Sequence, residues 1–343
     1  MAALDPALRH GGALDAAIAR FGGQRAEWLD LSTGINPAPP PLPDLSPALW
    51  QRLPEAELGA SAIAAARSCY GAPLQAGIVA APGTQALIAA LPSLLPHGRV
   101  AILEPTYSGH RLAFETAGHA VIGIAALTEV PAEATIAVVV NPNNPDGSVH
   151  EPAELLALAE RLAARGGLLV VDEAFADADP GRSVAFATGR PGLLVHRSFG
   201  KFFGLAGLRL GFALTTPGLA DALRGQLGAW AVSGPALAVG AAWLGDARLC
   251  ADIRASIARQ HGLLAATLAA TGLTPVGGTQ LFQTIRHPDA SALFAALCRR
   301  HILARPFAYR PDWLRIGNVA DEAEAGRLGA ALDDALGEIG PPA

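Results

Sequence analysis

RSFGKFFGLAGLRLG, residues 197–211, includes Lys201, the only lysine among the 25 lysine and arginine residues of the chain. Arginine can replace lysine wherever only positive charge is needed, but a guanidinium does not lose its proton in proteins and cannot attack a carbonyl carbon. A lysine retained in such a chain therefore suggests a nucleophilic amine, most naturally one that forms a Schiff base. The alternative is a chance survivor of an arginine-biased composition, and the surrounding residues decide between the two.

Short apolar runs alternate with amphipathic helical patterns on both sides of this stretch. Continuous apolar runs of this length, separated by helices, predict buried strands of an α/β sheet with helices on both faces. Ligands are expected at the ends of such strands. The predicted strands are Gly77–Ala81, Arg99–Leu103, Ala120–Ile124, Ile136–Val140, Leu168–Val171, Leu193–His196 and Leu210–Leu214.

The remaining patterns predict two domains and an arm. Residues 1–45 form an N-terminal arm that joins the small domain, with a short amphipathic piece at Leu14–Phe21 and a proline-rich run that cannot be regular helix. Residues 46–235 form a large α/β domain, which begins with a helical pattern over Leu49–Tyr70. Residues 236–343 form a small α+β domain. Its predicted strands are Thr279–Arg286, Ile302–Arg305 and Trp313–Ile316.

The composition narrows the classes of partner and the compartment. The net charge of −5 is scattered, without the basic stripe that binds nucleic acid or the polybasic segment that binds a membrane surface. Cys69, Cys250 and Cys298 are far apart and lack metal-ligand spacing, which indicates reduced thiols and no metal site. Asp5 and Arg9 interrupt the N-terminus where a secretion signal needs an apolar run, so we expect a cytoplasmic protein.

Polar motifs follow several predicted strands. Asp172 ends an apolar run, where a carboxylate is costly unless a cation or an N–H group, such as a pyridinium nitrogen, pairs with it. Residues 141–147, NPNNPDG, form a fixed turn that can aim an amide at a ligand. Residues 82–85, PGTQ, open a helix whose first N–H groups favour phosphate, and Tyr107 could stack on a flat cofactor. Each motif alone also occurs as ordinary structure.

Together, in this order and at these spacings, the motifs resemble those of the pyridoxal-phosphate-dependent enzymes of the aminotransferase type I fold. The resemblance covers nearly the whole chain, and its most specific part is Ser198 and Lys201 followed by Arg209. It implies a large, mostly parallel sheet domain that binds pyridoxal 5'-phosphate, a small α+β domain, and a homodimer.

The resemblance also implies a role for each matching residue. Lys201 forms the Schiff base, Asp172 pairs with the protonated pyridine nitrogen, and Tyr107 stacks on the ring; these are the predicted catalytic residues. Asn144 hydrogen-bonds the phenolic oxygen, and Arg315 binds the substrate carboxylate through a bidentate pair. The predicted cofactor-binding residues are Gly83, Thr84, Gln85, Tyr107, Asn144, Asp172, Ser198, Lys201 and Arg209.

Within this fold the sequence is most similar to the threonine-phosphate decarboxylases of cobalamin biosynthesis. The likeness includes His10-Gly11-Gly12, residues 31–37 and Phe175, where aminotransferases usually have tyrosine. It implies decarboxylation of L-threonine O-3-phosphate to (R)-1-amino-2-propanol O-2-phosphate. His10 could instead be a surface histidine, and Arg305 a structural ion-pair partner. The predicted substrate-binding residues are His10, Gly34, Asn36, Asn144, Arg305 and Arg315.

Two other functions stay open at this point. Histidinol-phosphate aminotransferases share the Asn143-Asn144-Pro145 motif and the stretch from Leu205 to Arg209. A non-catalytic cofactor-fold binding protein is suggested only by Phe175 and by Leu53, which replaces a tyrosine that reaches the neighbouring subunit's cofactor phosphate. Decarboxylation and transamination differ in which bond at the substrate Cα is held perpendicular to the cofactor ring, and sequence does not show that torsion.

Overall fold

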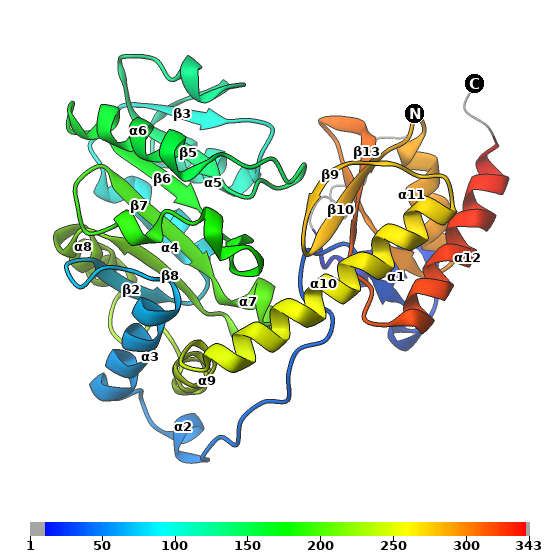
Figure 1. Ribbon diagram of the computed structural model, residues 1–343, viewed down its shortest axis with the longest axis horizontal. Coiled ribbons are helices and arrows are strands. Elements are labelled where there is room, and N and C mark those ends of the chain that lie inside the picture. The colour runs from blue at the N-terminus through cyan, green and yellow to red at the C-terminus, as the bar shows by residue number, and fades with distance from the viewer. Residues whose placement is uncertain (1–10, 341–343) are drawn as a thin grey trace. The chain divides into compact units, whose positions relative to one another are not determined.

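The computed structural model describes residues 11–340, which form two compact units (Figure 1). The sheet unit contains residues 39–144 and 148–254. The small unit contains the described residues up to Ala38, the short piece Pro145–Gly147, and those from Ala255 onward.

The bounds of these units differ from the predicted domain bounds at three places, one of which is Pro145–Gly147, predicted in the large domain but part of the small unit. Residues 39–45 and 236–254 belong to the sheet unit, although the sequence placed them in the arm and the small domain. The helix over Gly234–Leu244 is buried along most of its length and packs against the helix over Ala56–Cys69, so its apolar surface is covered within the sheet unit. Cofactor binding by this unit stays a prediction.

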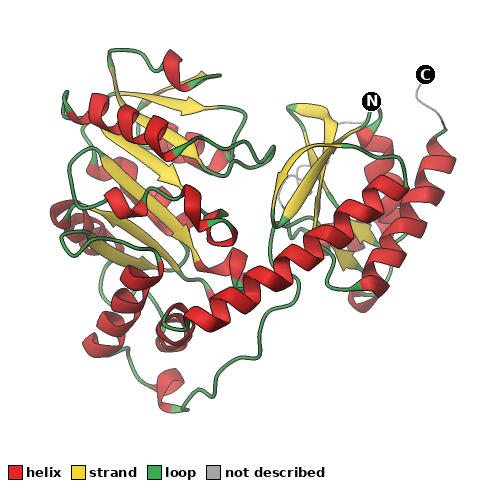
Figure 2. Ribbon diagram, in the orientation of Figure 1, coloured by secondary structure: helices red, strands yellow, loops and turns green. Residues whose placement is uncertain are grey.

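Seven strands form the sheet of this unit, in the order β2-β8-β7-β6-β5-β3-β4 (Figure 2). β8 runs antiparallel to β2 and β7, and the other neighbouring pairs are parallel, which confirms the predicted mostly parallel sheet. Each strand lies within two residues of its predicted bounds. The strands are β2 (Gly77–Ala81), β3 (Arg99–Leu103), β4 (Ala120–Ile124), β5 (Ala134–Val140), β6 (Leu168–Asp172), β7 (Leu193–Ser198) and β8 (Gly211–Thr215).

Alternate residues of these strands build one apolar core. Val138, Val170 and Leu194 point to the same face, where they pack with Leu87 and Leu223 from two helices. The helical pattern over 49–70 is divided in the structure, because Pro54 cannot continue a helix through its own position. The helices that begin in this unit are α2 (Ala48–Gln51), α3 (Ala56–Cys69), α4 (Thr84–Ala90), α5 (Ser108–Thr116), α6 (Pro152–Ala163), α7 (Phe199–Phe202), α8 (Pro217–Leu227), α9 (Gly234–Leu244) and α10 (Ala247–Ala270).

The small unit combines two short sheets with three further helices. One sheet has the order β12-β13-β10-β9, and the other pairs β1 with β11 in parallel. The strand predicted over 279–286 was wrong at its start, because residues 280–281 form the turn between two antiparallel strands. The elements are α1 (Leu14–Phe21), β1 (Leu29–Asp30), β9 (Pro275–Thr279), β10 (Phe282–Arg286), α11 (Ala290–Arg299), β11 (Ile302–Leu303), β12 (Arg305–Phe307), β13 (Arg310–Gly317) and α12 (Glu322–Ile339).

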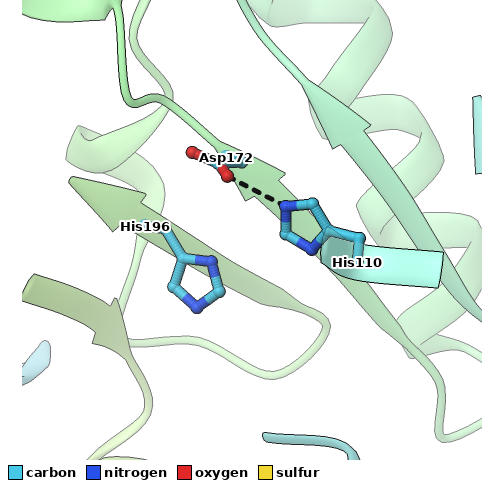
Figure 3. A group of neighbouring side chains, drawn as sticks. All are labelled: His110, Asp172 and His196. Carbon is cyan, nitrogen blue, oxygen red and sulfur yellow. Dashed lines mark hydrogen bonds and ion pairs between the residues drawn. The ribbon is translucent and has the colours of Figure 1, made fainter. Parts of the chain in front are cut away.

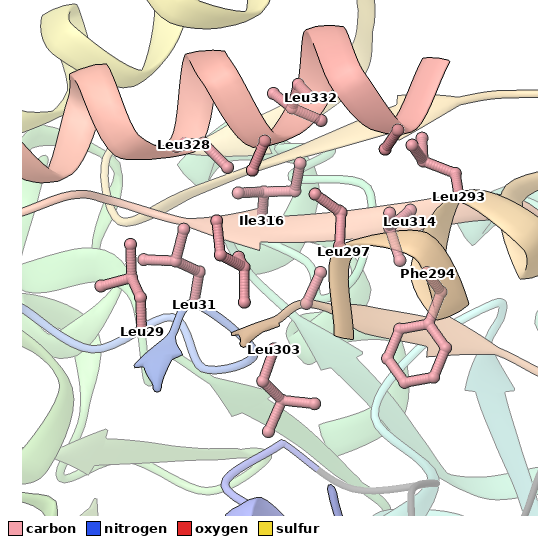
Figure 4. Close-up of a cluster of buried hydrophobic side chains, with 14 of the residues drawn as sticks. Leu29, Leu31, Leu293, Phe294, Leu297, Leu303, Leu314, Ile316, Leu328 and Leu332 are labelled. Atoms are coloured by element: carbon pink, nitrogen blue, oxygen red, sulfur yellow. The ribbon is translucent and has the colours of Figure 1, made fainter. Parts of the chain in front are cut away.

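The core of the small unit joins its sheets to its helices. Leu314 and Ile316 of β13 pack with Leu297 of α11 and Leu328 of α12, as Figure 4 shows. Leu31, from the N-terminal segment, belongs to the same cluster, so this part of the predicted arm is integral to the unit. Within residues 11–340, the helices are all too short or too polar to cross a membrane.

Candidate active site

Three neighbouring parallel strands of the sheet unit end at the same edge of the sheet. β5 is followed by the loop from Asn141, β6 ends in Asp172, and β7 ends in Ser198. The backbone N–H of Asn141 donates to the backbone oxygen of Asp172 at 2.8 Å, so the loop is attached directly to the end of β6. Lys201 follows Ser198 by three residues, in α7. The fold therefore brings the predicted Lys201, Asp172 and 141–144 segments to one edge.

Asp172 is a buried carboxylate that accepts hydrogen bonds from two groups of the described residues. His110 Nε2 lies 2.9 Å from Oδ2, and the N–H of Ala174 donates to Oδ1 at 3.1 Å (Figure 3). Burial raises the pKa of Asp172, but the hydrogen bond and the charge of His110, with a smaller effect of His196, lower it below its usual value. The carboxylate is thus held in its charged form, as pairing with a pyridinium nitrogen requires.

The loop after β5 is held by asparagine side chains that the sequence analysis did not single out. Asn141 bonds the backbone of His150 through both ends of its amide, at 2.8 and 3.2 Å. Asn143 accepts from the Thr106 hydroxyl at 2.6 Å and donates to the oxygen of Pro105 at 2.9 Å. The amides of Asn141 and Asn143 thus serve the loop itself, and Asn144 remains the predicted ligand contact.

Tyr107 lies at the start of α5 and is held at both its hydroxyl and its ring. Its hydroxyl donates to Gln85 Oε1 at 2.7 Å. Its ring meets the ring of His110 edge to face, with centroids 6.2 Å apart at 88°. A Cβ at Gly109 would come within 2.4 Å of the tyrosine ring, so glycine leaves the space that the ring occupies. The ring that is predicted to stack on the cofactor is therefore connected to Asp172 through His110.

Two glycines allow Arg209 and the start of α4 to approach each other. Gly83 has φ +85°, and a Cβ there would lie 2.5 Å from Arg209 Nη2. A Cβ at Gly211 would lie 2.6 Å from the backbone nitrogen of Thr84. A larger residue at Gly83 or Gly211 would therefore push the Arg209 guanidinium or the start of α4 out of place. Backbone amides at a helix start beside a guanidinium suit a phosphate group, so this place fits the phosphate of the implied cofactor.

Lys201 is held by a tightly packed turn. A Cβ at Gly200 would lie 2.7 Å from the Cα of Ala206, so the helical turn and the following segment are in backbone contact. The Nζ atom of Lys201 lies 5.9 Å from the centre of the ring of Phe175, which is 6% exposed. A cation at this distance from a ring face is attracted by the ring. A tyrosine at position 175 would add a hydroxyl to this contact.

A buried ion network supports the same edge of the sheet. Arg197, at 2% exposure, binds Glu173 at 2.7 Å and Asp177 at 2.6 Å, and its guanidinium lies 4.3 Å from the centre of the Tyr70 ring. Burial lowers the pKa of Arg197, but the two acids outweigh it and raise the pKa overall. Since Glu173 and Arg197 adjoin Asp172 and Ser198 in the chain, the network fixes the ends of β6 and β7.

The predicted substrate-binding residues that the structure describes lie in the small unit, apart from Asn144. Arg315 is buried on β13 and donates to the backbone oxygen of Ser32 at 2.8 Å. The Oδ1 atom of Asn36 accepts from the N–H of Ala38 at 3.0 Å and from Gln260 at 3.3 Å, which sets the orientation of the amide. Gly34 is buried between Ser32 and Asn36 in the same segment. His10 lies outside the described residues.

Arg305 and Arg315 stand opposite each other on neighbouring strands. Their Cα atoms are partners in the antiparallel pairing of β12 and β13. Burial, followed by the positive charge of Arg305, lowers the pKa of Arg315 to about 9. Because a lowered pKa means that the charged form is disfavoured, an anion brought to this pair would relieve an existing electrostatic cost.

Residues 55–332 match the Aminotransferase class I and II family. The chain belongs to this family. It is 47% identical to threonine-phosphate decarboxylases of Sinorhizobium sp. and Pseudomonas aeruginosa, over 94% and 95% of this chain and 97% of each relative. It is 33% identical to a histidinol-phosphate aminotransferase of Symbiobacterium thermophilum, over 71% of this chain and 72% of that one.

Solved structures of this family share the fold. A histidinol-phosphate aminotransferase from Sinorhizobium meliloti in complex with pyridoxal-5'-phosphate superposes with a TM-score of 0.77 at 23% identity, covering 95% of each chain. The predicted pyridoxal-phosphate-dependent transferase fold is thereby confirmed.

Sequence reasoning missed His110 and His196, which flank Asp172. His110 lies three residues after Tyr107 in a helix, a spacing that places both side chains on one face. His196 follows the apolar run Leu193–Val195 in β7 and precedes Arg197 and Ser198. Both signals were present, but neither distinguishes a site residue from a packed core histidine until the strand pairing is known.

Proposed function

We propose that this protein decarboxylates L-threonine O-3-phosphate with pyridoxal 5'-phosphate, as one step of cobalamin biosynthesis. The observation that carries the proposal is the near-full-length similarity to threonine-phosphate decarboxylases of two organisms. The similarity to histidinol-phosphate aminotransferases is lower and covers less of the chain, so transamination is the less supported reaction. A binding protein without activity is also less supported, because the near-full-length relatives are named as decarboxylases.

The residues at the sheet edge fit the cofactor. We assign Asp172 to the protonated pyridine nitrogen, since its carboxylate is buried and its pKa is lowered. Tyr107 is assigned to the face of the ring, and Asn144 to the phenolic oxygen. The groups assigned to the phosphate surround the close approach at Gly83 and Gly211, and they are Gly83, Thr84, Gln85, Ser198 and Arg209.

When bound, the cofactor would supply an electron sink for the pair left when the bond between Cα and the carboxylate breaks. Lys201 would hold the cofactor before substrate arrives. Its amine, displaced by the substrate and protonated, would then donate that proton to Cα in place of the departing CO₂, so the products are CO₂ and the protonated amino-alcohol phosphate. Asp172 would keep the pyridine nitrogen protonated. Phe175 packs beside the lysine and offers no hydroxyl to compete for the phenolic oxygen.

The small unit supplies the groups proposed for the substrate's charges. Arg315 takes the carboxylate through a bidentate pair. The phosphate is assigned to Arg305, Asn36 and His10, with Gly34 leaving room in the same segment. The like charges at Arg305 and Arg315 support an anionic substrate, because the charge of Arg305 helps to lower the pKa of Arg315 and a nearby anion would favour the charged form.

We also propose a cytoplasmic homodimer. Trp50 and Leu53 are exposed at 69% and 62% on and after α2, which is unusual for large apolar side chains. Leu53 lines a depression of about 250 Å³ together with Leu49 and Leu58. An exposed apolar surface of this kind supports association with a second copy, and sedimentation of the wild type and of Trp50→Glu would test it.

The deciding experiment incubates the cofactor-loaded protein with L-threonine O-3-phosphate and no keto acid. Release of CO₂ with formation of (R)-1-amino-2-propanol O-2-phosphate is the expected result. Absence of CO₂, together with keto-acid-dependent turnover of histidinol phosphate, would replace the decarboxylase by the aminotransferase. Serine phosphate, which lacks the methyl group, and free threonine, which lacks the phosphate, serve as matched comparison substrates.

A further inference from the structure

His196 is a buried histidine with no evident structural use. It has 0% exposure, and neither Nδ1 nor Nε2 has a hydrogen-bond partner among residues 11–340. An unpaired polar group in a protein interior costs stability and calls for an explanation. The residues before it in β7, Leu193, Leu194 and Val195, are apolar, and an apolar side chain at 196 would continue this run without that cost.

The ring of His196 lies beside the carboxylate of Asp172. The two residues are Cα partners in the parallel pairing of β6 and β7. Figure 3 shows His196 and His110 on either side of Asp172, with ring planes 15° apart and centroids separated by 6.1 Å. One nitrogen of each histidine and one oxygen of Asp172 lie within 4.8 Å of one another. A ring nitrogen of His196 therefore lies within 4.8 Å of a carboxylate oxygen without a hydrogen bond between them.

The carboxylate has room for this additional donor. An ionised carboxylate has about four acceptor positions. His110 and the N–H of Ala174 fill two of them. One of the remaining positions suits the pyridine N–H of the cofactor, which leaves one for a further N–H.

We propose that His196 is a positioning residue for Asp172. His196 donates a ring N–H to the carboxylate of Asp172 when the cofactor's pyridine N–H binds there. The proposal rests on the assignment of Asp172 to the pyridine nitrogen. Burial lowers the pKa of His196 to about 4, so the ring is neutral near pH 7 and one nitrogen carries the proton. The facing groups that titrate are Asp172 and His110. A neutral donor adds a bond to the carboxylate without neutralising the charge that holds the pyridinium.

The test measures two properties of the apoprotein: its thermal unfolding and its affinity for pyridoxal phosphate by absorbance titration. His196→Phe removes both nitrogens while keeping a flat ring. His196→Asn and His196→Gln each restore an amide N–H near one of the two ring nitrogens. Asp172→Asn reports separately on the carboxylate itself, and His196→Leu replaces the phenylalanine variant if that variant does not fold.

The proposal predicts opposite effects on the two properties. The apolar variant should unfold at the same temperature as the wild type or higher, yet bind pyridoxal phosphate about tenfold more weakly, with recovery in one amide variant. Unchanged cofactor affinity in the apolar variant, with weakened affinity in Asp172→Asn, overturns the role of His196 alone. Unchanged affinity in both overturns the assignment of Asp172.

Discussion

The two units hold buried charges in contrasting ways. At the edge of the sheet, Asp172 is paired with His110, and Arg197 is enclosed by Glu173 and Asp177. In the small unit, Arg305 and Arg315 are like charges on facing strands, and the pKa of Arg315 is lowered. Paired charges satisfy one another and hold a fixed geometry, whereas a neighbouring charge of the same sign disfavours the charged form, which a nearby anion would favour. The first arrangement suits a resident cofactor and the second a substrate that comes and goes.

The largest effect is expected at Lys201. Its variants test whether a positive charge at this position is enough for activity. Lys201→Ala should lower CO₂ release by at least about 10³-fold, because it removes the proposed proton donor and the cofactor's covalent attachment. Lys201→Arg keeps the positive charge but not a titratable amine, and should be equally inactive. Substantial activity in the arginine variant would contradict a nucleophilic and acid–base role.

Arg197 tests whether the paired network is structural. Arg197→Met leaves Glu173 and Asp177 buried without their cation and should lower the free energy of unfolding by about 3–5 kcal/mol in urea denaturation. The matched control is Arg182→Met, which removes a half-exposed arginine paired with Glu151 and should cost about 0–1 kcal/mol. Equal losses in the two variants would mean that the buried pairing contributes nothing beyond a surface pair.

His196 gives the paired region a pH dependence. Burial lowers the pKa of His196 from 6.5 to about 4. Between these pH values the histidine is therefore protonated in the unfolded chain and neutral in the folded chain. Stability is therefore lost as pH falls through this window, by about 3 kcal/mol between pH 7 and pH 4. In urea unfolding of the apoprotein, His196→Phe should lack this component. Parallel curves for variant and wild type would show that His196 does not titrate in this way.

The smallest effect is expected at Arg315, the residue proposed to bind the substrate carboxylate. Arg315→Lys keeps the charge but loses the planar pair of donors, so KM for L-threonine O-3-phosphate should rise about tenfold with a smaller change in kcat. Arg286→Lys is the control, since that arginine is exposed and paired with Asp312 in the same small sheet. An unchanged KM in Arg315→Lys would remove this residue from the carboxylate site.

The sequence predicted the sheet strands because each is an apolar run bounded by turn residues. β2, β3 and β4 have their predicted bounds, whereas the break at Pro54 and the turn at residues 280–281 were missed within continuous patterns. The hydrogen bonds that hold the site residues in place were missed for a different reason. Asn143 meets Thr106 across 37 positions and His110 meets Asp172 across 62, and no local pattern reports such distances.

The amino-acid sequence shows which chemical groups this protein has: one lysine side-chain amine that can lose its proton, an acid at the end of a strand, and glycines before and within a helix start. These are properties of residue type and short spacing, which a chain carries whatever its tertiary structure. Only the tertiary structure decided which charges are neighbours. Strand pairing put His196 beside Asp172 and Arg305 opposite Arg315, and burial then lowered the pKa values of His196 and Arg315. Desolvation and charge proximity depend on distance in space, which the order of residues does not record.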